Sequence, residues 1–331
     1  MHQDKTLEHW LSEYLTDGIH LNANELIRYR HHTKKISLNP TRTPAARLAG
    51  SYVSKLKGRG MEFDESRHYQ AGDDIRAIDW RVTARTGKTH TKIYREERER
   101  PIYIVTDLST SMQFGSEFMF KAVQAAHVSA LIAWAGIARG DKLGALAFNQ
   151  TAHIECKPKS RQSAVLQLIH QIIELQQQAL AMQKSKPPAT TDNALFNQNC
   201  ARLLRLAKPG SLIWIVSDFH HLDEQTLRIL SDLNRHSEVR AAAIYDPMEY
   251  QLPVTQNKQL LSITDGTTKR ALTLGDNTVN QRYSDWATQR NSRLSEALER
   301  SQIAGFNVSA GLPLLAQSLA VQPRRYVLES Q

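Results

Sequence analysis

The sequence is poor in cysteine and has no long apolar run, and both absences exclude whole classes of protein. Its two cysteines, Cys156 and Cys200, match no metal-binding or redox spacing, so a reducing compartment is the default. The longest apolar-rich run, residues 122–138, is interrupted by polar side chains and falls short of a bilayer span. The polar N-terminus, MHQDKTLEHW, lacks the apolar core of a secretory signal. We therefore expect a cytoplasmic protein without a transmembrane segment.

Positive charge is concentrated in the N-terminal third of the chain. The net charge is +9, and residues 28–100 hold 18 Lys and Arg against 9 Asp and Glu. Residues 1–27 hold one Lys against five acids, and residues 101–331 hold 23 basic residues against 19 acids. This distribution predicts two parts, residues 1–100 and residues 101–331. The basic part suits an acidic partner, a phosphate backbone or an anionic surface, and charge alone does not choose among them.

Short apolar runs alternate with helical patterns from Ile102 onward. This alternation is typical of an α/β fold with a mostly parallel sheet covered by helices on both faces. An Asp-Gly turn predicts a polar hairpin at 259–274, followed by a helix at about 280–302. The predicted strands are 102–107, 143–148, 152–156, 211–217, 239–245 and 306–311, and the helices between them lie near 116–138, 160–183, 193–207 and 222–235.

The first hundred residues have a different pattern. Apolar residues share one helical face in residues 7–15, and a second helix is expected from about 24 to 35. Residues 58–100 are rich in glycine, charge and turn signals, which predicts short strands and turns with a helical turn near 74–80. We therefore expect a basic, irregular N-terminal segment ahead of the α/β part.

Polar side chains with oxygen atoms follow two of the predicted strands. Asp107, Ser109 and Ser111 stand at the end of the first strand, with no Lys, Arg or His in that motif, and Ser217-Asp218 end another strand. Ligands of open α/β sheets bind at such strand ends, and hard oxygen donors suit Mg²⁺ or Mn²⁺ better than Zn²⁺. The simpler alternative is that these residues only cap helices. The second strand ending in Ser-Asp favours a metal site.

Two stretches resemble known families. The motif DLSTS, with a later TD and SD, resembles the metal-ion-dependent adhesion site of von Willebrand factor type A domains. The block GRGMEFDESRHYQAGDDIRAIDWRVTARTGKTHTKIYREERERP is similar to the signature of the bacterial domain-of-unknown-function 58 family. The similarity covers roughly residues 40–250, and it implies a von Willebrand A-like, Rossmann-type domain.

The resemblance also implies roles for individual residues. Ser109 and Ser111 would bind Mg²⁺ directly, Thr191 would do so in at least one state, and Asp107 and Asp218 would hold coordinating waters. Few carboxylates would then contact the ion, which could accept an Asp or Glu from a partner protein. The usual Gly-Gly before the threonine is PPAT here, so Thr190 and Thr191 both remain candidates. The Asp-Gly that is common after the second strand is replaced by Asp218-Phe219.

The resemblance implies a non-enzymatic adaptor that works with a MoxR-type AAA+ ATPase in the assembly or maturation of protein complexes. The sequence holds no P-loop, so any ATP dependence must come from another protein. Some relatives have transmembrane helices before the signature block and this chain has none there, so any attachment to the inner membrane would be peripheral and through a partner.

Two other functions stay open. Aromatic residues interleave with the basic residues of 28–100, which is typical of nucleic-acid binding, although the nine acids of that stretch would repel phosphates unless they are neutralised internally. A metal-dependent hydrolase would use the same ion, but the sequence offers no clear general base; Asp218 is a possible candidate.

The segment AGDDIRAIDW carries a third group of carboxylates. Asp73, Asp74 and Asp79 could form a nuclease-type metal cluster. Arginines lie among them at matching density, so we favour Arg–carboxylate pairs that fix an irregular segment. We expect Gly72 to adopt a positive φ and Trp80 to anchor a core. The paired histidines at 31–32 and 220–221 are interpreted as solvent-exposed or capping side chains and not as ligands, and both cysteines as small buried apolar groups.

Overall fold

The computed structural model describes residues 7–40, 61–96, 100–183, 192–253, 255, 259–264 and 269–321. The chain forms two compact units. Residues 1–46 and 101–331 make up one of them, called the large unit here, and residues 47–100 make up the small unit. The N-terminal helices therefore belong with the α/β part, and not with the basic block with which the sequence analysis grouped them.

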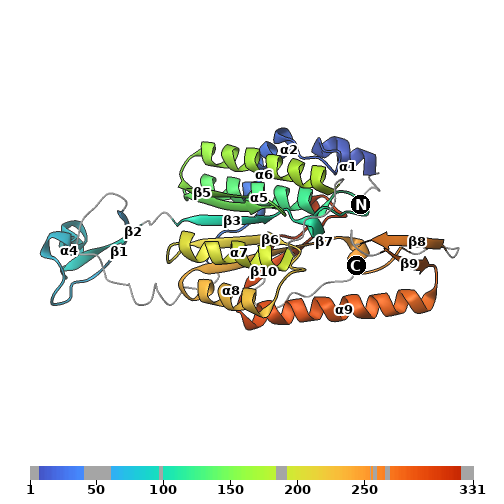
Figure 1. The fold of residues 1–331 in the computed structure, drawn as a ribbon. Coiled ribbons are helices and arrows are strands. Elements are labelled where there is room, and N and C mark those ends of the chain that lie inside the picture. The colour runs from blue at the N-terminus through green and yellow to red at the C-terminus, as the bar shows by residue number, and fades with distance from the viewer. Residues whose placement is uncertain are drawn as a thin grey trace, which may run out of the picture. The chain divides into compact units, whose positions relative to one another are not determined.

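A six-stranded sheet forms the centre of the large unit, in the order β10-β7-β6-β3-β4-β5 (Figure 1). All neighbouring strands are parallel except β4 and β5, which are antiparallel. The prediction of a mixed α/β fold with a mostly parallel sheet is confirmed. The strands are β3 (Ile102–Asp107), β4 (Leu143–Phe148), β5 (His153–Lys159), β6 (Leu212–Ser217), β7 (Glu238–Tyr245) and β10 (Ala304–Ser309).

Helices cover both faces of this sheet (Figure 1). Because successive residues of a strand point to opposite faces, Ile102 and Ile104 enter one hydrophobic core while Tyr103 and Val105 enter the other. The first core packs under α5 (Lys121–Ala138) and α6 (Gln162–Gln183), and the second under α7 (Asp192–Leu206) and α8 (Glu224–His236). Strands buried on both faces need the continuous apolar runs that the sequence shows.

The N-terminal helices add a layer outside α5. They are α1 (Leu7–Tyr14) and α2 (Ala23–Ile27), followed by two short 3₁₀ turns, η1 (Arg28–His31) and η2 (Thr33–Lys35). Asn22 closes a capping box with Glu25 at the start of α2. The buried Tyr29 hydroxyl lies 2.9 Å from Nδ1 of His127 on α5. The single helix that we expected over 24–35 is thus divided into a short α-helix and two 3₁₀ turns.

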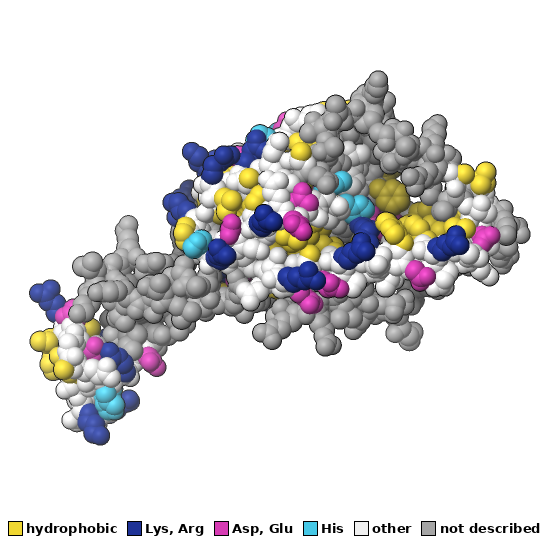
Figure 2. Space-filling model, turned by 60° about the horizontal axis from the view of Figure 1, so that its bottom comes forward, with side chains coloured by type: hydrophobic (Ala, Val, Ile, Leu, Met, Phe, Trp, Pro, Cys, Tyr) yellow, Lys and Arg dark blue, Asp and Glu magenta, His cyan; other side chains and the backbone are white. Residues whose placement is uncertain are grey.

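The small unit is a hairpin of β1 (Met61–His68) and β2 (His90–Glu96) with η3 (Ile75–Ala77) and α4 (Trp80–Thr86) between them. Gly72 has a φ of 107°, as predicted. Trp80 is 69% exposed and Ile75 is 67% exposed, so the prediction of Trp80 as a core anchor is wrong. In Figure 2 the described part of this unit, at the lower left, shows hydrophobic, basic, acidic and histidine side chains on its surface.

The C-terminal part begins with the predicted hairpin, β8 (Gln259–Thr264) and β9 (Lys269–Leu274), which are antiparallel. The long helix α9 (Asn277–Arg300) follows and leads into β10. Two further 3₁₀ turns, η5 (Pro247–Glu249) and η6 (Leu314–Ala316), lie after β7 and β10. Among the helices that the structure describes, none combines the length and the apolar character needed to span a bilayer.

Candidate cation site at the ends of strands β3 and β6

The site lies where the order of the strands reverses. The next strand along the chain after β3 is β4, which pairs on one side of β3, whereas β6 pairs on the other side. Open α/β sheets bind ligands outside the carboxyl ends of their strands at such a point, because the connections leave it in opposite directions. Asp107 is the last residue of β3 and Ser217 the last residue of β6. The fold therefore brings the two predicted strand-end motifs together.

Asp107 is buried and accepts hydrogen bonds from neutral groups of Ser217 and Ser109. The Ser217 hydroxyl donates to its Oδ2 at 2.7 Å, and the Ser109 N–H donates to its Oδ1 at 2.9 Å. Burial and the neighbouring Asp218 carboxylate raise the pKa of Asp107 to about 6. Among the side chains that the structure describes, no basic group pairs with this carboxyl. A cation beside Asp107 would favour the ionised form.

Two hydroxyl groups lie next to each other just beyond Asp107. Oγ of Ser109 and Oγ of Ser111 are 3.4 Å apart. Neighbouring ligands of an octahedral Mg²⁺ ion lie about 3 Å apart, because each bond is about 2.1 Å long. The Ser109 side chain makes no capping hydrogen bond at the start of η4 (Thr110–Met112), so the simpler capping explanation does not account for it. Hard oxygen atoms at this spacing fit Mg²⁺ or Mn²⁺.

Asp218 has a basic partner that the sequence analysis missed. Nζ of Lys121, the first residue of α5, donates to Oδ2 of Asp218 at 2.7 Å and to Oε1 of Glu249 at 2.5 Å. The side chains of Lys121 and Asp218 are both 1% exposed. Burial alone would lower the pKa of Lys121, but the two carboxylates outweigh it and raise that pKa. Burial likewise opposes ionisation of Asp218, yet Lys121 and His220 hold its pKa below the ordinary value.

His220 completes this group. Its Nε2 lies 3.2 Å from Oε1 of Glu249 and 3.9 Å from Oδ2 of Asp218. We refer to Lys121, Asp218, His220 and Glu249 as the Lys121 cluster. The sequence analysis set His220 aside as a solvent-exposed or capping residue. A lysine between apolar residues at the start of a helix, in FMFKAV, is the one signal in the sequence that a buried acid must lie nearby.

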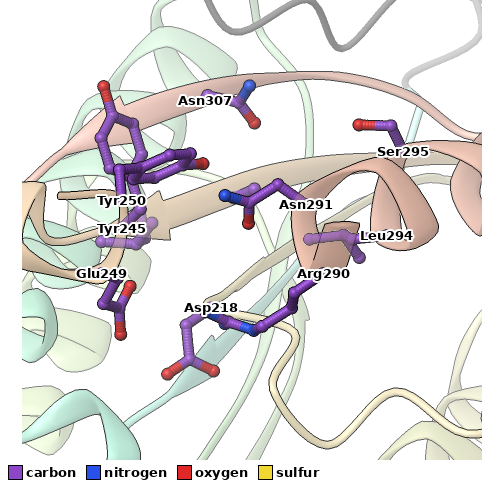
Figure 3. A pocket seen from close by; sticks show the side chains of 11 residues that line it. Asp218, Tyr245, Glu249, Tyr250, Arg290, Asn291, Leu294, Ser295 and Asn307 are labelled. Carbon is purple, nitrogen blue, oxygen red and sulfur yellow. The ribbon is translucent and has the colours of Figure 1, made fainter. Parts of the chain in front are cut away.

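A pocket adjoins the Lys121 cluster on the side of α9. Its lining includes Tyr245 and Tyr250 from the end of β7 and the turn after it, and Arg290 and Asn291 from α9. Figure 3 shows the carboxylates of Asp218 and Glu249 at one end of this pocket. Burial and the neighbouring Tyr245 raise the pKa of Tyr250, which stays a neutral hydrogen-bonding group. The pocket is thus lined by polar groups that come from several elements, among them β7, α9 and β10.

The residue after Asp218 has an unusual backbone conformation. Phe219 has a φ of 53°, in the left-handed region that glycine prefers. The sequence has Phe219 where the resemblance implies glycine, and Phe219 adopts a left-handed turn of the kind that suits glycine. Its ring is buried against Phe196 of α7 at 6.2 Å between centroids, and its N–H donates to Oγ of Ser217 at 3.1 Å. Core packing therefore holds the turn that presents Asp218.

Two sets of predicted residues are still to be placed: the two threonines before α7 and the acids of the Gly-Asp-Asp block. Thr190 and Thr191 lie outside the described residues. In the Gly-Asp-Asp block, Asp73 pairs with Arg67 at 2.8 Å, and Asp79 caps α4 and accepts from the Ser66 hydroxyl. Asp74 caps η3. Of the described His, Cys, Asp and Glu side chains, Asp218, His220 and Glu249 lie close enough to share an ion, and the block offers no such group.

Comparisons with known proteins place the chain among uncharacterized relatives. The sequence model of a family described as "Protein of unknown function DUF58" matches residues 65–293. Uncharacterized proteins of Mycobacterium bovis and Mycobacterium tuberculosis are 27% identical over 269 residues, covering 81% of this chain and 78% of each relative.

Solved structures give weaker likenesses. The conserved hypothetical protein BatB from Bacteroides thetaiotaomicron aligns with a TM-score of 0.34 and 11% identity, covering 61% of this chain and 98% of that one. An aerotolerance-related membrane protein from Bacteroides fragilis aligns with a TM-score of 0.34 and 13% identity, and the alignment covers 57% of this chain and 88% of that one. Similarity at this level carries no argument about the present chain.

Proposed function

This chain belongs to the DUF58 family of proteins of unknown function, and we propose that it is a non-enzymatic, protein-binding adaptor with one divalent cation as its docking point. The ion in this proposal is Mg²⁺ or Mn²⁺, held in a von Willebrand A-like site by Asp107, Ser109, Ser111, Thr191 and Asp218. The observation that supports it most is the buried Asp107 carboxyl, whose pKa is raised and whose neighbours include two adjacent hydroxyl oxygens.

The proposed residues have distinct tasks. Ser109 and Ser111 present free lone pairs and would bind the ion directly. Both oxygens of Asp107 already accept hydrogen bonds, so this carboxylate would act mainly through its charge and through bound water. Asp218 shares its Oδ2 with Lys121, which reduces the negative charge that it offers. When bound, the ion would supply a Lewis-acidic point that takes an Asp or Glu of a partner protein as a further ligand.

We further propose that the partner is a MoxR-type AAA+ ATPase and that the adaptor presents a client to it during assembly or maturation of protein complexes. An adaptor needs a stable frame and one switchable contact. Here the frame is a sheet whose inner strands are buried on both faces, and the contact would be an ion at the carboxyl ends of β3 and β6. Among the described residues of the site there are hydroxyls and carboxylates but no evident nucleophile–base pair, which suits binding better than catalysis.

The test is binding of the purified ATPase with and without Mg²⁺. We expect wild type to bind it with Mg²⁺ and to lose binding after EDTA, and the Ser109→Ala/Ser111→Ala variant to stay unbound in both conditions. Ser12→Ala/Ser292→Ala is the matched control, because both serines are exposed and lie on α1 and α9. Equal binding by wild type and the Ser109→Ala/Ser111→Ala variant would contradict the proposal.

A second candidate function is nucleic-acid binding by the small unit, and one observation favours it. The acids of the Gly-Asp-Asp block are engaged locally, Asp73 with Arg67 and Asp79 as the cap of α4. Arg81, Arg85 and the aromatic ring of Trp80 are exposed on the same short helix. Fluorescence anisotropy with a single-stranded oligonucleotide tests this function. Affinity should fall steeply with salt and further with Arg81→Glu/Arg85→Glu.

A further inference from the structure

Three members of the Lys121 cluster, Asp218, His220 and Glu249, are residue types that bind transition metals. The ammonium group of Lys121 lies between the two carboxylates. Asp218, His220 and Glu249 each offer one ligand-type atom, and these atoms lie within 4.8 Å of one another. Two carboxylates and one imidazole are a ligand set that Zn²⁺, Co²⁺ and Mn²⁺ accept. Nζ of Lys121 contacts the same oxygens, Oδ2 of Asp218 and Oε1 of Glu249, at 2.7 and 2.5 Å.

An ammonium and a metal ion cannot share these oxygens. Two like charges so close together in a buried site repel strongly, because the surroundings screen them poorly. The Lys121 side chain is 1% exposed, and its helix fixes the position of its backbone, so it cannot move into solvent without opening the core. The nitrogen contacts both carboxylates, as a bound cation would, and its single positive charge offsets one of their two negative charges.

We propose that Lys121 is a tethered cation that takes the place of a metal ion between Asp218, His220 and Glu249. The cluster consequently needs no divalent ion and excludes transition metals. Its charge is fixed by the chain itself and does not vary with the supply of metal. Asp218 belongs to both groups, but this inference concerns its Oδ2 beside Lys121 and does not depend on Ser109, Ser111 or the adaptor function.

An ordinary buried ion pair would contain the same contacts, so the test must separate the two ideas. A purely structural Lys121 predicts only a loss of stability when the ammonium is removed. A tethered cation also predicts that removal creates a metal site, since the three ligand atoms are already grouped. Lys121→Met keeps the length of the side chain and removes its charge, which makes it the informative variant.

The experiment is titration of the full chain with Co²⁺, followed by visible absorption and by calorimetry. We expect Lys121→Met to bind one more Co²⁺ ion per chain than wild type, and Lys121→Met/His220→Gln to lose that ion. The added ion should also raise the Tm of Lys121→Met, with no such rise in Lys121→Met/His220→Gln. If folded Lys121→Met binds no additional Co²⁺, the proposal is overturned.

A second measurement asks whether the cluster of the wild-type chain holds a metal ion, and it does not require Lys121→Met to fold. His220→Gln in the otherwise wild-type chain should leave Co²⁺ binding unchanged, because Lys121 already fills the cluster. Weaker Co²⁺ binding by His220→Gln would show a metal in the cluster of the wild type and overturn the proposal. Loss of Mg²⁺ binding in Ser109→Ala/Ser111→Ala reports on the adaptor site alone, so failure of the two ideas is distinguishable.

Discussion

In the large unit, polar groups are buried at the strand ends, and the apolar side chains around them fill two cores. In the described part of the small unit the buried side chains, Asp79, Thr91 and Arg100, are all polar, while the apolar Trp80 and Ile75 are exposed. A packed frame can hold a carboxyl such as Asp107 in an unfavourable state, which makes it sensitive to a cation. In the small unit, by contrast, Asp73 and Asp79 are bound by neighbouring groups, and apolar and basic side chains such as Trp80 and Arg81 lie at the surface.

The largest expected difference between the two units is the loss of stability when one tryptophan in each unit is replaced by alanine. Trp214 is fully buried on β6 between Phe306 and Arg240, so Trp214→Ala should lower the free energy of unfolding by about 3–5 kcal/mol. Trp80→Ala should change it by less than about 0.5 kcal/mol. Urea unfolding monitored by circular dichroism measures both. A large loss for Trp80→Ala would mean that the small unit packs against another surface.

The ion pairs of the two units provide a second contrast. Asp218→Asn leaves Lys121 with one carboxylate in a buried site and should cost about 3 kcal/mol of stability. Asp73→Asn removes the partner of Arg67 near solvent, where such pairs contribute little, and its effect should be much smaller. Thermal unfolding of both variants at one pH provides the measurement. Equal losses would show that the small unit shields its ion pair from water.

The smallest expected effect is a pH-dependent stabilisation by Mg²⁺. The pKa of Asp107 is raised from 3.8 to about 6, so its contribution to stability is present at low pH and is lost as the pH rises through 6. Asp218, with a lowered pKa, has the opposite sign, because its contribution is present at neutral pH and is lost in acid. At pH 8 a bound cation should restore the stability that the ionised Asp107 carboxyl removes.

We therefore expect saturating Mg²⁺ to raise the Tm by about 3–6 °C at pH 8 and by much less at pH 5. Differential scanning fluorimetry at the two pH values measures this. Asp107→Asn is the matched control, since it keeps the shape of the side chain and cannot ionise, and its response to Mg²⁺ should be small and independent of pH. A larger shift at pH 5 than at pH 8 would contradict the assignment of the ion to Asp107.

The sequence predicted the inner strands of the sheet well because they are buried on both faces. The runs 102–107 and 143–148 coincide with β3 and β4, whose residues are all buried. Prediction was poorer where no continuous apolar run marks the boundary. The helix expected from 116 begins at Lys121, because a loop precedes it in which Gly115 approaches the Met119 carbonyl too closely for any side chain.

The predicted site residues that the structure describes, Asp107, Ser109, Ser111 and Asp218, lie at one end of the sheet, but the charged groups around them did not follow from the sequence. Lys121 meets acids that are 97 and 128 residues further along the chain, and no local pattern reports contacts at that separation. The prediction for Trp80 failed for a different reason. Hydrophobicity indicates burial only where a core is large enough to receive the side chain, and the small unit has no such core in its described part.

The left-handed turn at Phe219 links the carboxyl of Asp107 to a helix on the surface of the sheet. Phe196 of α7 packs on Phe219, whose N–H is bound to Ser217, which in turn donates to Asp107. Close-packed rings do not separate without opening a void, so a shift of α7 must carry the turn with it. A protein that binds the outer surface of α7 would thereby change the hydrogen bond between Ser217 and Asp107 without contacting Asp107 itself.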